Sequence, residues 1–341
     1  MSLRNSSKLI FYGLGGAGQR HLRFLYKHFK HKINILAYRA KNKVQVISKD
    51  FQLTGKLLSE EYKDIIFFKS YKESLVKKIN YAFICGPTSK NFLVTKDCLE
   101  KKRNIFVEKP FICSLKNFFT LKNKINKLNL KILVGYQRRF HPLVIKLKKM
   151  LEKNNNKNKK VVWIKVNSYV PDWHKYENFK NLYACKKELG GGALFTECHE
   201  IDLCLFLFGM PRKINCKKYF SKKIGINVET AYKLKLFYEN VLVYIDVNMF
   251  SQNLKRKIKI IDKKHQYELD LLKNILVKND NNGSRFYSIK NTGDIQFVNQ
   301  LRYFFSSRFN LKTSLSQIEN NLKILLACNK SYQTKRIVNL K

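Results

Sequence analysis

The sequence lacks long hydrophobic runs, paired cysteine motifs and, above all, acidic residues. No apolar run reaches the roughly 18 residues that a transmembrane helix needs, which excludes a membrane span. The 8 cysteines are scattered without a Cys-x-x-Cys pair, so we predict neither a metal site nor a disulfide framework. The first residues also lack the apolar core of a signal peptide, and we expect a cytoplasmic protein with reduced thiols.

Acidic residues are few, since 24 Asp and Glu stand against 68 Lys and Arg, for a net charge of +44. Such an excess of basic residues is typical of nucleic-acid-binding proteins, so this class has to be considered. Lys outnumbers Arg roughly four to one, however, whereas proteins that read guanine or phosphate favour the forked Arg side chain. We therefore expect no nucleic-acid partner, and a positive field that attracts anionic ligands such as dinucleotides and sugar nucleotides.

Apolar residues make up 45% of the 341 positions, which is enough for two domains with their own cores. In the first half, short apolar runs alternate with helical patterns, as in βαβ units that build a parallel sheet. The predicted strands cover residues 8–12, 33–38, 81–85, 105–107 and 132–134.

The second half is rich in β-branched residues that alternate with polar ones, which is typical of a largely antiparallel sheet. A helical pattern lies between Gly190 and Gly209, and a last helix is predicted from about residue 314 to 333. We place the domain boundary after Gly135, giving domains 1–135 and 136–341, with the last helix packing back on the first domain. The predicted strands cover residues 161–166, 231–237, 241–247 and 257–261.

A glycine-rich turn follows the first strand and opens the first helix. Gly13, Gly15 and Gly18 fit the pattern G-x-G-x-x-G, which is credible only in this strand-to-helix context. The first Gly permits the tight turn, the second lets backbone approach a pyrophosphate, and the third lets helix and strand pack closely. Together with Gly16 and Ala17 they predict a dinucleotide site at the helix N-terminus; the alternative is a βα turn without a ligand.

The residue that follows the second strand bears on the choice of dinucleotide. About 20 residues after the glycine turn, an acidic side chain would hold the ribose hydroxyls of NAD. This sequence has Arg39 there, and an Arg can pair with a 2′-phosphate. We therefore expect NADP or NAD, with NADP slightly favoured; the alternative is that Arg39 stacks over the adenine or faces solvent.

Glu108-Lys109-Pro110 after a strand resembles the glucose-fructose oxidoreductase / inositol dehydrogenase / rhizopine-catabolism (Gfo/Idh/MocA) oxidoreductases. Further matches follow in order along the chain up to about residue 210. They resemble the branch of the family found in sugar and surface-glycan metabolism. The matching segments are Arg20-His21 after the last glycine, Ile84-Cys85-Gly86-Pro87-Thr88, Gly135-Tyr136-Gln137-Arg138-Arg139, Gly190-Gly191-Gly192 and His199-Glu200-Ile201-Asp202.

The resemblance implies an α/β fold, with an N-terminal Rossmann domain and a C-terminal α/β domain that carries a large, mostly antiparallel sheet. It implies hydride transfer between a nicotinamide and a small-molecule substrate of the sugar or polyol type. The open face of the second sheet commonly makes the subunit contact in this family, so we expect a homo-oligomer.

Lys109 and His199 are the predicted catalytic residues. The Lys109 ammonium can orient the reacting oxygen and stabilise developing negative charge, and the His199 imidazole can pass a proton in either direction. The resemblance also places Pro87, Glu108 and Lys109 against the cofactor, with a cis bond before Pro110. The alternatives are a surface lysine and a satisfied core histidine.

One position departs from the family pattern. Many members carry an Asp four residues before this His, where the sequence has Phe195. Either Lys109 and His199 act without this Asp, or the proton route differs from the family's pairing of a carboxylate with the histidine. The residues that we expect to line the substrate cleft are Tyr136, Arg139, Trp173, Thr196 and Asp202.

The sequence thus predicts an NAD(P)-dependent dehydrogenase or reductase that acts on a CH–OH group of a sugar, amino sugar or nucleotide sugar. The alternative is a non-catalytic dinucleotide-binding sensor or regulator with the same fold. The missing Asp before His199 favours the alternative, and the presence of Lys109 and His199 disfavours it.

Overall fold

The computed structural model describes residues 7–39, 44–76, 78–153, 158–290 and 294–340. The chain divides into two compact units, and it passes between them several times. The first unit consists of Met1–Gly135, Trp173–Asn178 and Phe297–Glu319. The second consists of Tyr136–Asp172, Phe179–Gln296 and Asn320–Lys341.

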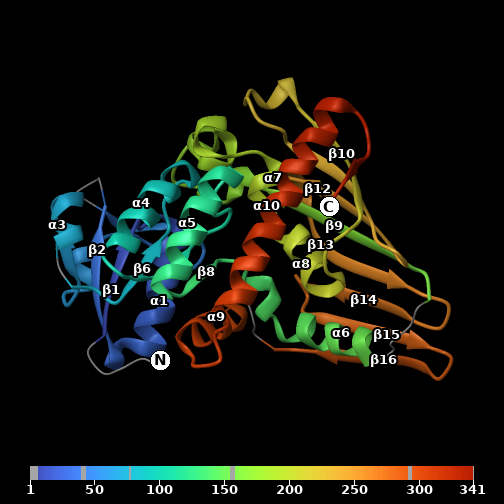
Figure 1. Ribbon diagram of the computed structural model, residues 1–341, viewed down its shortest axis with the longest axis horizontal. Helices are drawn as coiled ribbons and strands as arrows, with labels where there is room; N and C mark the ends of the chain where they lie inside the picture. Colours follow the sequence, from blue (N-terminus) through green and yellow to red (C-terminus); the bar gives the residue numbers. More distant parts are fainter. Residues whose placement is uncertain (1–6, 40–43, 77, 154–157, 291–293, 341) are drawn as a thin grey trace. The chain divides into compact units, whose positions relative to one another are not determined.

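The first unit is built on a parallel sheet in the order β5-β2-β1-β6-β7-β8 (Figure 1). This confirms the predicted parallel sheet. The strand order reverses its direction between β1 and β6, and ligands of such sheets bind beyond the carboxyl ends of the strands at that point. The strands are β1 (Ser7–Tyr12), β2 (Ile33–Tyr38), β5 (Ile66–Phe68), β6 (Tyr81–Ile84), β7 (Asn104–Val107) and β8 (Ile132–Val134).

Helices connect these strands, and a short hairpin of β3 (Gln45–Ile47) with β4 (Leu53–Leu57) is added. Helix α5 begins at a Ser114 cap, whose hydroxyl accepts from Asn117 N, and ends at Asn129 in the left-handed conformation. The helices are α1 (Gly16–Phe29), η1 (Lys30–Lys32), α2 (Leu58–Glu61), α3 (Tyr71–Val76), α4 (Thr88–Glu100), α5 (Leu115–Leu128) and α9 (Ile295–Phe305).

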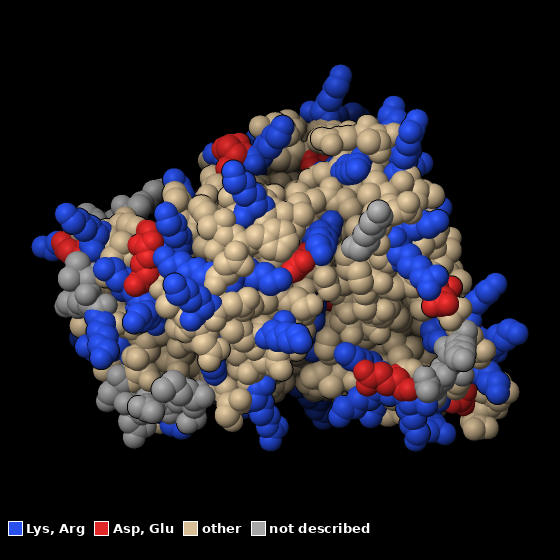
Figure 2. Space-filling view, in the orientation of Figure 1, with Lys and Arg blue, Asp and Glu red and all other residues tan. Residues whose placement is uncertain are grey.

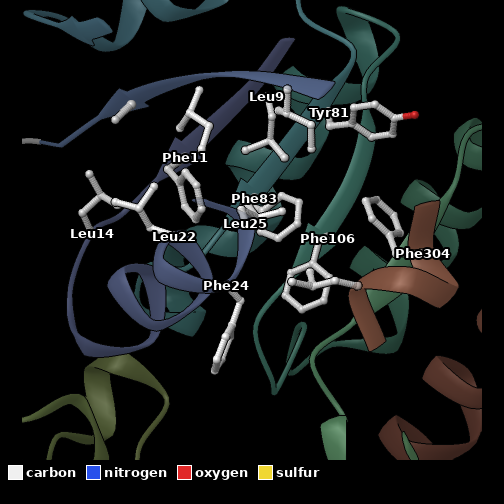
Figure 3. Close-up of a cluster of buried hydrophobic side chains, with 14 of the residues drawn as sticks. Leu9, Phe11, Leu14, Leu22, Phe24, Leu25, Tyr81, Phe83, Phe106 and Phe304 are labelled. Atoms are coloured by element: carbon white, nitrogen blue, oxygen red, sulfur yellow. The ribbon is translucent and has the colours of Figure 1, made fainter. Parts of the chain in front are cut away.

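The core of this unit joins segments that are far apart in the sequence (Figure 3). Phe83 of β6 and Phe106 of β7 stack with ring centroids 4.7 Å apart, and Phe304 of α9 meets both rings edge-on at 6.0 Å. Such aromatic pairs contribute free energy beyond the area that they bury. The packing therefore ties α9 to the centre of the first sheet, although about 190 residues separate them along the chain.

The second unit is built on a mixed sheet in the order β16-β15-β14-β13-β9-β12-β11-β10-β17. Strands β9 and β12 pair in parallel, and the other neighbours pair antiparallel, which confirms the predicted, mostly antiparallel sheet. The strands are β9 (Lys160–Tyr169), β10 (Lys213–Tyr219), β11 (Ala231–Phe237), β12 (Val241–Asn248), β13 (Phe250–Ile261), β14 (Gln266–Asp270), β15 (Ile275–Asp280), β16 (Gly283–Ser288) and β17 (Val338–Asn339).

Helices cover one face of this sheet (Figure 1). The helical pattern between Gly190 and Gly209 forms two helices that separate at Glu197 and Cys198, where the Glu197 carbonyl accepts from the Tyr232 hydroxyl at 3.0 Å. In the described part of the chain, no helix combines the length and the apolar character that a membrane crossing requires. The helices are η2 (Gln137–Phe140), α6 (Pro142–Lys153), η3 (Val170–Asp172), η4 (Phe179–Asn181), η5 (Tyr183–Cys185), η6 (Lys187–Leu189), α7 (Ala193–Thr196), α8 (His199–Phe208), η7 (Lys222–Ile224) and α10 (Leu311–Thr334), whose first residues belong to the first unit.

Candidate functional site

In the glycine turn between β1 and α1, two of the glycines have no room for a side chain, whereas a third faces open space. Gly13 has φ +97°, and a Cβ on it would lie 2.9 Å from Gly86 N. A Cβ on Gly18 would lie 2.2 Å from the Gly13 oxygen. A Cβ on Gly15 would meet nothing within 4 Å, so the backbone there is open to a ligand. This is the division of roles that a diphosphate-binding turn needs.

The N-terminus of α1 faces this open space. Gly15 caps the helix without a side-chain hydrogen bond, and no acidic residue lies in the first turn, Gly16-Ala17-Gly18. The first N–H groups of any helix have no partner within the helix, and its dipole favours an anion there. The geometry of the predicted residues therefore fits the pyrophosphate of a dinucleotide.

A segment distant in sequence, Trp173–Asn178, belongs to the first unit and lies against the glycine turn. A Cβ on Gly16 would lie 2.9 Å from His174 Nε2, so the imidazole closes that side of the turn. The His174 ring stacks on Phe51 with centroids 5.7 Å apart, and its Nδ1 contacts Glu177 Oε1 at 2.8 Å. Trp173 is predicted at the substrate, yet its segment lies against the glycine turn, and no sequence signal indicated the stacking of Phe51 on His174.

Arg39 follows β2 and lies beside the same turn. Its Nη1 donates to the Leu14 carbonyl at 3.2 Å. Burial lowers the pKa of Arg39, and the nearby Tyr176 and Glu177 oppose that effect. The guanidinium is thus held at the carboxyl end of β2, where an adenosine ribose lies in folds of this topology.

Glu108, Lys109 and Pro110 follow β7, next to the loop after β6. The bond between Lys109 and Pro110 is cis, as expected. Glu108 Oε2 accepts from the Lys109 backbone N–H at 3.2 Å, and Glu108 Oε1 contacts His21 Nε2 at 2.6 Å. In the loop after β6, a Cβ on Gly86 would meet nothing within 4 Å, and Pro87 caps α4. The carboxyl ends of β1, β6 and β7 thus bring the predicted cofactor residues together.

The pKa of Glu108 falls from 4.5 to about 2, because His21, Arg20 and Lys109 outweigh the opposing effect of burial. A carboxyl group whose pKa is lowered by folding stabilises the folded state at pH values above its ordinary pKa. This contribution is lost as the pH falls through the lowered pKa. For Glu108 this is about 3 kcal/mol of folding free energy at neutral pH. Glu108→Gln should therefore unfold at lower urea concentration at neutral pH, and its deficit should shrink between pH 4.5 and about 2. A deficit independent of pH in that range would contradict this origin.

In the second unit, His199 is the first residue of α8 and is 4% exposed. Tyr136 meets its ring edge-on, with centroids 6.2 Å apart, and is itself buried. Burial raises the pKa of Tyr136 well above its ordinary value, and the nearby Cys198 and Asp202 add to this rise. Thr196 is fully buried just before α8. Tyr136 thus lies against His199, and Thr196 ends the short helix α7 just before α8; their roles toward a substrate stay predictions.

Arg139 and Asp202 face each other. Arg139 Nε and Nη2 donate to the two Asp202 carboxylate oxygens, each at 2.5 Å, and Asn321 Nδ2 donates to Asp202 Oδ1 at 2.8 Å. Burial raises the pKa of Asp202, and the Arg139 charge opposes the rise. This bidentate pair ties η2 to α8. A contact of either side chain with substrate stays a prediction.

A second buried network, which was not predicted from the sequence, holds the carboxylates of Glu197 and Glu200, which precede and follow His199 in the sequence. Arg256 of β13 donates to Glu200 Oε1 at 2.5 Å and to Glu197 Oε2 at 3.1 Å. Ser168 of β9 donates to Glu197 Oε1 at 3.0 Å. The carboxylates before and after His199 are therefore anchored to the sheet, and both point to structural partners.

Sequence comparison supports the function of the first unit. Residues 8–136 match a family described as the oxidoreductase family with NAD-binding Rossmann fold, Gfo/Idh/MocA. A protein of Formosa agariphila named Oxidoreductase P35 is 25% identical over 171 residues, which is 47% of this chain. The match spans only 52% of that relative's own length.

Comparison with solved structures extends the fold to the whole chain. Aldose-aldose oxidoreductase from Caulobacter crescentus, complexed with glycerol, has a TM-score of 0.80 at 13% identity, covering 98% of this chain and all of that chain (100%). An oxidoreductase from Agrobacterium radiobacter, in complex with NAD+, L-tartaric acid and magnesium, has a TM-score of 0.79 at 13% identity, covering 98% of each chain. The resemblance found in the sequence is thereby confirmed: residues 8–136 form an NAD-binding Rossmann domain of the Gfo/Idh/MocA oxidoreductase family.

Proposed function

We propose that this protein is an NAD(P)-dependent dehydrogenase or reductase that transfers hydride to or from a CH–OH carbon of a sugar, amino sugar or nucleotide sugar. The observation that carries the proposal lies in the first unit. Three neighbouring strands of one sheet each end at a predicted cofactor residue. Strand β1 leads into the open turn at Gly15, β6 leads into the open loop at Gly86, and β7 leads to Lys109. Turnover of a panel of sugars and nucleotide sugars with NADH and NADPH tests it.

A dinucleotide bound to residues 1–135 supplies the hydride acceptor or donor. The glycine turn holds the pyrophosphate on backbone N–H groups, and Arg39 lies beside the adenosine ribose. Pro87, Glu108 and Lys109 position the nicotinamide end. The open space beside Gly15 and Gly86 supports this assignment, because both allow a ligand to approach the backbone closely.

Two side chains of this chain handle the charge and the proton at the reacting CH–OH group. We assign to Lys109 the orientation of the substrate oxygen and the stabilisation of its developing negative charge. We assign to His199 the acceptance of the hydroxyl proton in oxidation and its return in reduction. Glu197 and Glu200 point to Arg256, so the proton route ends on the imidazole rather than on a neighbouring carboxylate.

Several residues of 136–341 are assigned to the substrate in this proposal. Tyr136 and Thr196 are assigned to substrate because both lie with His199 at the start of α8. We also assign Arg139 and Asp202 to the substrate, and Trp173 to an apolar platform for a sugar ring. The name of the Caulobacter crescentus structure, an aldose-aldose oxidoreductase, supports a sugar substrate by analogy alone.

Arg39→Ala should weaken NADP binding by about tenfold or more and NAD binding much less. The expected reason is the loss of a charge-assisted hydrogen bond to the 2′-phosphate, which NAD lacks. Dissociation constants for both cofactors, measured by nicotinamide fluorescence on the wild type and the variant, test this. Equal losses for the two cofactors would remove the preference for NADP.

We also propose that the open face of the second sheet joins two copies of this chain. Trp163 of β9 is 42% exposed and stacks on Tyr244 of β12, at 6.3 Å between centroids. An exposed aromatic side chain stacked on a half-buried one, on a broad sheet face, is typical of a subunit contact. The ion pair of Lys165 and Asp246, at 2.6 Å, extends the same strand pair.

A non-catalytic sensor is the second candidate function. Phe195 supports it, because the family's usual Asp is missing at this position. Tight binding of NADP without turnover of any sugar or nucleotide sugar would favour the sensor. A nucleic-acid partner has less support, since Lys and Arg are scattered over the visible face without a single gathering (Figure 2).

A further inference from the structure

We infer that His21 and Asn91 are positioning residues, which hold the Glu108–Pro110 turn from two sides and thereby fix Lys109. The inference rests on the proposed role of Lys109. His21 lies on α1 and Asn91 on α4, and both side chains are buried. Neither residue touches the reacting atoms in this account, and both act through the backbone of the turn.

The His21 ring is held in one orientation by aromatic neighbours. Phe106, Phe297 and Phe83 meet it edge-on, with centroids at 4.8, 5.9 and 6.1 Å. Among the described residues, Nδ1 has no hydrogen-bond partner, so Glu108 is the polar group that this ring serves. A polar ring in an apolar cage costs free energy unless it makes a hydrogen bond. The imidazole that carries its proton on Nε2 meets that cost by donating to Glu108 at 2.6 Å.

The Glu108 carboxylate is confined on its remaining sides. Its Oε2 accepts from the Lys109 backbone N–H at 3.2 Å. A Cβ on Gly135 would lie 3.0 Å from the same oxygen, so a larger residue at this position would press on the carboxylate. The side chain therefore links α1 to the peptide that precedes the Lys109 side chain.

Asn91 anchors the other end of the turn. It is 1% exposed, and its Nδ2 donates to the Pro110 carbonyl at 3.2 Å and to the Phe111 carbonyl at 3.0 Å. Lys109 thus lies between two peptides that are each held by a buried side chain from a different helix. Such anchoring limits where its ammonium can move, which is what precise placement of a charge in a site requires.

His21→Ala and Asn91→Ala should each reduce kcat by about 10- to 100-fold, with KM and the cofactor dissociation constant changed by less than about threefold. His21→Gln should restore much of the loss, because its amide can present a donor where Nε2 lies. The matched control is Arg103→Gln at the opposite end of β7, where the fully buried Arg103 donates to the Ser74 carbonyl. It should lower the Tm at least as much while leaving kcat within about twofold. Equal losses of kcat in the control would overturn the inference.

A readout independent of turnover separates this inference from the proposed function. The rate at which an amine-reactive reagent labels Lys109, followed by peptide mass spectrometry, should rise at least about threefold in His21→Ala and Asn91→Ala, because the turn is released. Labelling of the exposed Lys96 on α4 should not change. A changed rate at Lys109 in a protein without turnover would support the anchoring and refute the proposed function. An unchanged rate in whichever of the two variants folds would refute the anchoring.

Discussion

Lys109→Met is expected to reduce turnover by about 10²- to 10⁴-fold, with the affinity for NAD(P) changed by less than about threefold. Methionine keeps much of the length and the apolar stem of lysine and removes the charge. The loss should be in kcat and kcat/KM together, because the ammonium acts on charge that develops at the substrate oxygen in the transition state. Steady-state kinetics and nicotinamide fluorescence measure the two effects.

The control for this variant is Lys96→Met, since Lys96 is an exposed residue on α4 of the same unit. It carries the same change of charge and should leave turnover unaltered. If Lys109→Met turned over at the wild-type rate, the assignment of Lys109 would be wrong. An equal loss in both variants would point to the net charge of the protein rather than to this position.

Arg256→Met is expected to lower the free energy of unfolding by about 3–5 kcal/mol, because it leaves two buried carboxylates without their shared cation. Burial disfavours the charged form of Arg256 and so lowers its pKa. The negative charges of Glu197 and Glu200 outweigh this effect and raise the pKa above the ordinary value. Burial also raises the pKa of Glu200, and the positive charges of Arg256 and Arg138 oppose this rise. Without Arg256, the carboxyl groups should take up protons more readily in the folded state.

The pH dependence of this deficit has a definite sign. An acid whose pKa is raised by folding destabilises the folded state as the pH rises through that pKa. The deficit of Arg256→Met should therefore be largest near neutral pH and smaller near pH 5, as urea unfolding would show. Arg212→Met is the control, because the Arg212–Glu239 pair is largely exposed, and it should cost less than about 1 kcal/mol. A similar cost for both variants would contradict the account.

Local sequence patterns were sufficient to predict the parallel sheet and the glycine turn. Buried strands such as Tyr81–Ile84 are continuous apolar runs, and Gly13, Gly15 and Gly18 are spaced as the turn requires. Such features depend on residues that are neighbours in the sequence. The Glu-Lys-Pro context after a predicted strand places Lys109 at the end of that strand, while its catalytic role is implied by the family resemblance and stays a prediction.

Long-range pairings could not be predicted in this way. His21 and Glu108 are 87 residues apart, and Arg139 and Asp202 are 63 residues apart, so only the folded chain shows that each carboxylate has a buried partner. The return of Trp173–Asn178 to the first unit left no local signal either. Strand β16 is mostly exposed and lacks the apolar alternation by which a strand is recognised.

The most direct test of the proposed oxidoreductase function is the nicotinamide absorbance of the purified protein in single turnover. The protein is loaded with NADPH or NADH and mixed with a panel of oxidised sugars and nucleotide sugars, so that the measurement works even if the cofactor is not released. We expect loss of the reduced-nicotinamide signal with at least one member of the panel, and no such loss in Lys109→Met on the same time scale. A stable signal with every member, despite a bound cofactor, would contradict the account and favour the sensor.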